Sequence, residues 1–246
     1  MRKSYRELTE EIKTDGERLK LIAALGSSDD LAYHYTLISE DWAAGGTLML
    51  ENSFDRHGEA GIVFLLERLR ALGTASKTDE SAAADTATDT AYLAAKILSQ
   101  LRHRDFYAAR AKELAALLTA RWDISDIALR RKQIIALGWI GSEAEVEVLI
   151  DSMQSDSDAL CRAWAAAALM QLSFHGVDAA FLRERTKTAF AAAIQKEGDL
   201  NAAGIMIEAA QTLFGKKWIS AAAAEAAESE SIEKARKSAL RFLGKA

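Results

Sequence analysis

Side chains that could carry out chemistry are widely scattered in this sequence of 246 residues. The histidines show no His-x-x-x-His spacing, and the only cysteine, Cys161, excludes a Cys-x-x-Cys pair. Asp156-Ser157-Asp158 lacks the later glycine and glutamate of a calcium-binding loop. We therefore predict no metal, no cofactor and no catalytic residue, and we expect Cys161 to be a small buried hydrophobic residue. The histidines expected at the surface or at helix caps are His34, His57, His103 and His175.

Four arginines recur at one position relative to the end of an aliphatic run. The arginines and the slots eight residues after them are Arg18 and Gly26, Arg130 and Gly138, Arg162 and Met170, and Arg236 and Gly244. Eight residues are just over two helical turns, so each arginine lies on the same face as its helix end. Such a row could bind anions, or it could pair with acidic residues of neighbouring turns. We favour pairing, for which Asp126, Asp156 and Asp158 are well placed.

The candidates for partner binding follow directly after two of these arginines. Arg131, Lys132 and Trp164 occupy the variable slots, and tryptophan and arginine are enriched at interaction hot spots. Trp164 could instead fill a gap beside the small residues 165–168, whereas Trp122 and Trp139 at helix boundaries are expected to pack between helices. The candidate surface is completed by two residues of the next helix. It comprises Arg131, Lys132, Trp164, Glu208 and Gln211.

One acid–aromatic cluster lies near the N-terminus. Glu40-Asp41 precedes Trp42 directly, and Tyr33 and Tyr35 come one to two turns earlier. The cluster could supply a carboxylate to a site, but the pattern has little specificity.

The elements that position these residues follow from an internal repeat. Residues 129–138 align with residues 161–170 at an offset of 32, with an amphipathic run and a polar turn between them. A period of roughly 30–45 residues built from two short helices is typical of an α-solenoid. The chain has no proline, where average usage predicts about 12, which suits a protein that is nearly all helix.

Apolar periodicity predicts the positions of the helices. They are expected over 3–13, 16–25, 29–44, 58–72, 88–102, 105–121, 124–137, 143–153, 159–173, 178–196, 199–214, 217–228 and 231–243. Residues 74–85 are rich in Ala, Ser, Thr and Asp, and we interpret them as a loop. Glycines that follow aliphatic runs, at positions 26, 73, 138, 215 and 244, are expected to end helices in the left-handed conformation. No window alternates with period two, so no strand is predicted.

The segment 127–172 resembles HEAT repeats, in particular the shorter HEAT-like repeats first grouped with phycobilin lyases. Their second helix has the pattern aliphatic-Arg-x-x-Ala-Ala-x-Ala-Leu-Gly. Residues 161–169 match it through Arg162, Ala165, Ala166, Ala168 and Leu169, and Met170 replaces the final glycine. The resemblance implies an all-α, right-handed α-solenoid of about six antiparallel helix pairs, forming one domain over residues 1–246. It also implies that the second helices line the concave side.

Charge and composition limit the classes of partner. The net charge of −5 and the pI near 5.5 argue against binding to nucleic acid or to an anionic membrane, because both need a basic face. The longest apolar run, residues 163–170, is too short to cross a bilayer, and no signal peptide is apparent. The single cysteine suits a reducing cytoplasm.

Two functions from different classes fit these observations. The first is a non-catalytic scaffold that binds another protein on its concave face, as an adaptor, a regulatory subunit or an immunity-type protein that neutralises a bacterial toxin. The alternative is an enzyme, since HEAT-like alkylpurine DNA glycosylases resemble this chain in length and use exposed aromatic residues with a carboxylate and an arginine. That resemblance implies a basic concave groove, so the charge of the concave face separates the two hypotheses.

Overall fold

The computed structural model describes residues 2–73, 80–122 and 124–244, and these ranges contain thirteen α-helices and no strand. The N-terminal arm consists of α1 (Tyr5–Glu11), α2 (Asp15–Gly26), α3 (Leu31–Ala43), the 3-10 helix η1 (Leu50–His57) and α4 (Gly58–Gly73). The central helices are α5 (Glu80–Gln100), α6 (Tyr107–Thr119), α7 (Ile127–Ile140), η3 (Glu143–Glu145), α8 (Val146–Ser155) and α9 (Ala159–Phe174). The chain continues with α10 (Ala179–Lys196), α11 (Leu200–Leu213), α12 (Ala221–Glu225) and α13 (Ser229–Leu243).

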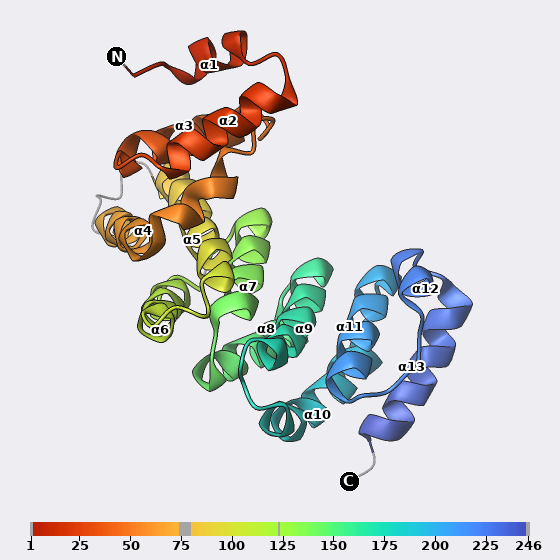
Figure 1. The fold of residues 1–246 in the computed structure, drawn as a ribbon. Coiled ribbons are helices and arrows are strands. Elements are labelled where there is room, and N and C mark those ends of the chain that lie inside the picture. Colours follow the sequence, from red (N-terminus) through yellow and green to blue (C-terminus); the bar gives the residue numbers. More distant parts are fainter. Residues whose placement is uncertain (1, 74–79, 123, 245–246) are drawn as a thin grey trace.

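The helices form an arc of two layers (Figure 1). The inner layer is made of α5, α7, α9 and α11, each packed against the next, and α13 closes it by packing against α11. The outer layer is made of α6, α8 and α10, and each of these helices packs against the inner helix that follows it. This arrangement confirms the predicted all-α solenoid. Among the described residues, no helix is both long enough and apolar enough to cross a membrane.

The inner helices begin with the same cap. The carboxylates of Asp126, Asp158 and Asp199 each accept a hydrogen bond from the backbone N–H three residues later, at the start of α7, α9 and α11. An aspartate in this position satisfies an N–H group that has no partner within the helix. The repeated cap gives the three helices a common register, so equivalent positions can be compared between them.

The predicted loop over 74–85 is wrong for its second half. Helix α5 begins at Glu80, and residues 74–79 lie outside the described residues. The alanine-rich segment 80–85 lacks apolar periodicity. Alanine has the highest intrinsic helix propensity, however, so this segment can extend α5, whose later residues pack against other helices. The helix expected over 217–228 is also shorter, since α12 covers only Ala221–Glu225, and no helix was predicted over the residues of η1.

Glycine lets the inner helices approach each other. A Cβ atom on Gly138 of α7 would lie 2.8 Å from the Cβ of Ala168 on α9. Gly26 is also helical, so the expected left-handed conformation is wrong for both residues. Of the glycines expected to be left-handed, Gly215 has this conformation, with a φ of 62°. The small residues of α7 and α9 therefore set how closely the layers pack.

The close contact predicts opposite effects for two Gly→Ala substitutions. Gly138→Ala should lower the free energy of unfolding by about 1 kcal/mol, because overpacking against Ala168 outweighs the gain in helix propensity. Gly16→Ala in α2 should raise it by up to about 1 kcal/mol, since the nearest heavy atom to the new Cβ lies 3.9 Å away. Urea denaturation of both variants would test the packing, and stabilisation by Gly138→Ala would contradict it.

Candidate functional site

Three positions per inner helix remain uncovered on the side that faces the hollow of the arc. They are the sixth, ninth and thirteenth residues after each N-cap aspartate, and all are half-buried or exposed, while the positions between them are mostly buried. Because the other sides of α7, α9 and α11 pack against neighbouring helices, these positions form the inner surface. They are Lys132, Ile135 and Trp139 on α7, Trp164, Ala167 and Gln171 on α9, and Ile205, Glu208 and Thr212 on α11.

Helix α5 continues this surface on the N-terminal side. The carboxylate of Asp89 pairs with the ammonium group of Lys132, and the ring of Tyr92 lies 5.1 Å from that of Trp139. Asp89, Tyr92 and Lys96 are half-buried and follow the same helical spacing. We call these three residues, together with the nine named above, the inner face.

Three of the five candidate binding residues lie on the inner face. Lys132, Trp164 and Glu208 are on neighbouring helices, and Trp164 is 37% exposed. Trp164 therefore does not simply fill a gap inside the stack.

The other two candidates are held by contacts within the chain. Arg131 turns towards the start of α9, where its guanidinium forms hydrogen bonds of 2.8–3.0 Å with Asp158. The side-chain amide of Gln211 donates to the carbonyl of Ile219 and accepts from the N–H groups of Trp218 and Ile219. Arg131 and Gln211 thus hold a helix start and a loop in place.

The charges on the inner face are almost fully compensated. Lys132 pairs with Asp89, and Lys96 pairs with Glu51 of η1 at 3.2 Å. Glu208 has no ion pair or side-chain hydrogen bond within the described part of the chain. The inner face therefore carries no excess of positive charge.

A cleft of about 680 Å³ adjoins the inner face near the N-terminal arm. Its lining includes Tyr35 and Trp42 of α3 as well as Glu51, Tyr92 and Lys132. The sequence suggested the acid–aromatic cluster of α3 but not its partners, because α3 and α5 meet only through tertiary packing. Asp41 of that cluster is buried and accepts hydrogen bonds from the Tyr5 hydroxyl and the Leu48 N–H, so it supports the local fold.

Three of the four recurring arginines contact a neighbouring repeat, whereas Arg18 pairs with Asp15 of its own helix. Of the acidic partners expected from the sequence, Asp156 pairs with a recurring arginine, while Asp126 caps α7 and Asp158 pairs with Arg131. Arg130 donates two hydrogen bonds to Asp156, at 2.9 and 3.1 Å, and Arg162 donates two to Glu197, at 2.7 and 2.9 Å. Both guanidinium groups also donate to carbonyls of the loop that precedes their helix. Arg236 donates to the carbonyls of Ile194 and Glu197. Because these guanidinium groups already have partners within the chain, they do not form a row that is available to bind an anion.

One expectation about the histidines is wrong. His34 is fully buried, its Nδ1 lies 2.8 Å from Nε2 of His57, and its Nε2 lies 3.0 Å from the carbonyl oxygen of Leu50. That carbonyl requires Nε2 of His34 to donate, so Nδ1 accepts a hydrogen bond from His57. Burial lowers the pKa of both histidines. The pair is a neutral structural contact that only the tertiary fold brings together.

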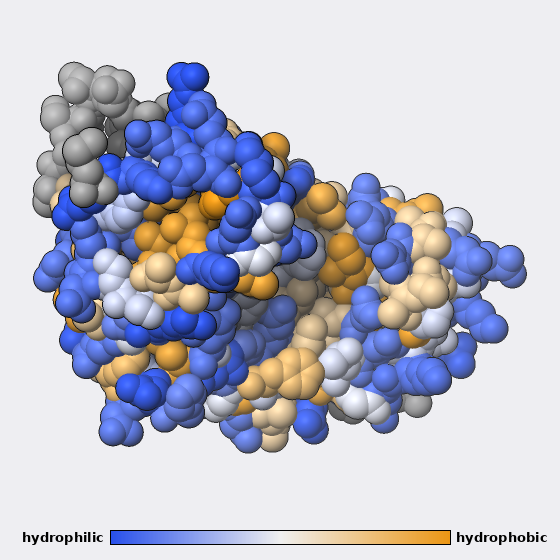
Figure 2. Space-filling model, turned by 45° about the horizontal axis from the view of Figure 1, so that its top comes forward, coloured by the Kyte–Doolittle hydropathy of each residue, from blue (hydrophilic) through white to orange (hydrophobic). Residues whose placement is uncertain are grey.

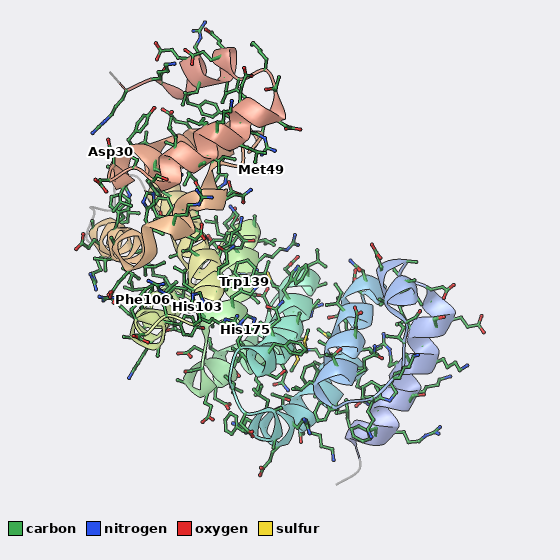
Figure 3. The ribbon with its side chains drawn as sticks, viewed as in Figure 1. Asp30, Met49, His103, Phe106, Trp139 and His175 are labelled. Carbon is green, nitrogen blue, oxygen red and sulfur yellow. The ribbon has the colours of Figure 1, made fainter. Side chains whose placement is uncertain are left out.

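The other potentially reactive side chains also pack or form hydrogen bonds within the fold. His103, Trp139 and His175 gather where α5, α7 and α9 end (Figure 3), and Nη2 of Arg102 lies 3.0 Å from Nε2 of His175. Cys161 is fully buried, and burial raises the pKa of its thiol to about 12, so it is no nucleophile. Within the described ranges, no group of three metal-ligating side chains occurs.

The stacked helix pairs define the chain as an α-solenoid. The family model described as HEAT repeats matches residues 80–170, which span α5 to most of α9, so this part of the chain is similar to HEAT repeats. Neither the curated proteins nor the solved structures gave a match. HEAT repeats in general mediate protein interactions through extended surfaces of this kind.

The buried arginine pair yields a prediction about stability. Arg162→Ala should cost about 3–5 kcal/mol of unfolding free energy, because the Glu197 side chain, 2% exposed, would lose its counter-charge. Arg185→Ala is the matched control, since it removes an equally bidentate pair with Glu147 in which both side chains are more than half exposed. It should cost less than about 1 kcal/mol.

The cost of Arg162→Ala should also depend on pH. Burial alone would raise the pKa of the Glu197 carboxyl, but hydrogen bonds from Arg162 and from the N–H of Asp199 outweigh burial and hold the pKa below its ordinary value. The pair therefore contributes its full stability above about pH 4.5 and loses it as the pH falls through the lowered pKa. The difference between wild type and Arg162→Ala in thermal melts should shrink on acidification, and an unchanged difference would contradict this account.

Proposed function

We propose that this protein is a non-catalytic scaffold whose inner face binds another protein. The observation that supports this most directly is Trp164, an exposed tryptophan in the middle of a surface built on rigid helices. Tryptophan has few rotatable bonds and a large apolar area, so its burial by a partner is favourable at low cost in conformational entropy.

The neighbours of Trp164 strengthen the proposal. Ile135, Ala167 and Ile205 add apolar surface on three adjacent helices, and none of them is fully buried. Figure 2 shows a hollow between the two arms of the arc, with apolar side chains on its walls and hydrophilic ones around it. Such a surface, apolar in the centre and polar at the rim, is the usual anatomy of a protein–protein interface.

A residue of the N-terminal arm extends this surface. Met49 is exposed, has a φ of 53°, and lies on the inner side of the arm in Figure 3. A left-handed conformation is costly for a residue other than glycine, and such strain concentrates at binding sites. An adaptor or a regulatory subunit could use Met49 and Trp164 as contacts at two places along the arc.

The charge of the inner face favours this function over the alkylpurine DNA glycosylase. A protein that holds duplex DNA needs unpaired lysine or arginine side chains to neutralise phosphates. The two lysines of the inner face, Lys96 and Lys132, are each paired with a carboxylate. The carboxylate of Glu208 adds repulsion towards phosphate.

Truncation of the central tryptophan should weaken binding. Trp164→Ala should reduce the affinity for a partner co-purified from the source cells at least ~30-fold, which corresponds to about 2 kcal/mol, and should leave the helical content unchanged. Leu19→Ala, which removes an exposed apolar side chain of α2 outside the inner face, should have little effect. Calorimetric titration and circular dichroism would measure both properties. Equal affinities of the two variants would refute the proposed binding surface.

Duplex DNA should bind weakly or not at all. At roughly 150 mM salt we expect no dissociation constant below the micromolar range, because the inner face offers no net positive charge. A gel-shift titration with plain and alkylated duplexes tests this expectation. Nanomolar binding, or release of an alkylated base, would favour the glycosylase.

A further inference from the structure

Glu208 is the one charged residue of the inner face that lacks a counter-charge within the described part of the chain. The other three charged residues there, Asp89, Lys96 and Lys132, all take part in ion pairs. Glu208 is half-buried at the ninth position of α11, and its backbone carbonyl, but not its carboxylate, accepts a hydrogen bond from Thr212. The inner face therefore presents one uncompensated negative charge.

The inner-face residues that precede the level of Glu208 on α9 and α11 are apolar or aromatic, whereas Gln171 and Thr212 follow it. Helices α9 and α11 pack directly against each other. Trp164 of α9 lies level with Ile205 of α11, and Ala167 lies level with Glu208, one helical turn further on. Neighbouring helix axes lie roughly 8–10 Å apart, so one long side chain of a partner can reach both the indole and the carboxylate. A partner that covers this surface would exclude water, which strengthens an ion pair with Glu208.

We propose that the inner face captures a cationic side chain of its protein partner, an arginine, between the indole of Trp164 and the carboxylate of Glu208. A planar guanidinium can stack on an aromatic ring and can donate two parallel hydrogen bonds to a carboxylate. The net charge of −5 favours approach of a basic partner surface. This inference rests on the proposed scaffold function and specifies the chemistry of the partner.

A library of short random peptides displayed on phage, selected on the full-length chain, tests the proposal with a defined probe. We expect the enriched peptides to carry an arginine next to apolar residues. A synthetic copy of one enriched peptide is then compared with a version in which citrulline, a neutral analogue of similar shape, replaces the arginine. The citrulline peptide should bind about tenfold or more weakly.

Variants of the chain identify the residue that recognises the cation. Glu208→Gln should weaken the arginine peptide by a similar factor and should not weaken the citrulline peptide further, which is the signature of a direct pair in a double-mutant cycle. Glu184→Gln on the outer helix α10 is the control, because Glu184 is an exposed glutamate away from the inner face that, like Glu208, has no ion pair among the described residues. Both variants should melt at the wild-type temperature within a few degrees.

The outcomes separate this proposal from the proposed function. Enriched peptides without a basic residue, or equal effects of Glu208→Gln and Glu184→Gln, would overturn the arginine site and leave the scaffold intact. No enrichment on wild type relative to Trp164→Ala would overturn both. Release of a cationic alkylated base from duplex DNA would assign the Trp164–Glu208 pair to a nucleic acid and would also overturn the proposal.

Discussion

The structure depends on close contact between successive inner helices. In an open stack each helix can bury its apolar side only against its neighbours, so no single central core compensates for a loose contact. The chain meets this constraint with small residues: Gly138 of α7 lies against Ala168 of α9, and about half of the buried residues of α9 and α11 are alanine. Small side chains bury little area each, and the stack gains stability from the short distance between helices and from the polar contacts at their ends.

Arginines supply those polar contacts at both ends of the inner helices. At one end, Arg130 and Arg162 connect a loop to the next repeat through a carboxylate and two carbonyl groups. At the other end, Arg102 donates to the carbonyls of Trp139 and Phe174, where α7 and α9 finish. These two carbonyls lie in the last turns of their helices, where no backbone N–H within the helix can pair with them, so Arg102 supplies the missing donors. Because these arginines form contacts at the helix ends, the inner face between those ends carries few charged side chains.

The sequence was informative where a feature repeats and uninformative where a contact is unique. The helices from 127 to 174 and the bridging role of Arg130 and Arg162 follow from local periodicity and from a motif that occurs twice. The inner face was predicted only in part, since helical spacing places Lys132, Trp164 and Glu208 but says nothing about a loop that returns to Gln211. The His34–His57 pair and the cleft between α3 and α5 depend on packing between segments far apart in the chain, for which a single sequence offers no signal.

Rigidity connects this packing to the proposed function. The residues of the inner face lie on helices whose other sides are buried, so a partner would not need to order them on binding, and little conformational entropy would be lost. The same arrangement makes the distance between Trp164 and Glu208 a property of the contact between α9 and α11. A change that widens the stack should therefore alter recognition even when it touches no inner-face residue. In a closed globular core such a change is absorbed locally, whereas in a solenoid it displaces every repeat that follows.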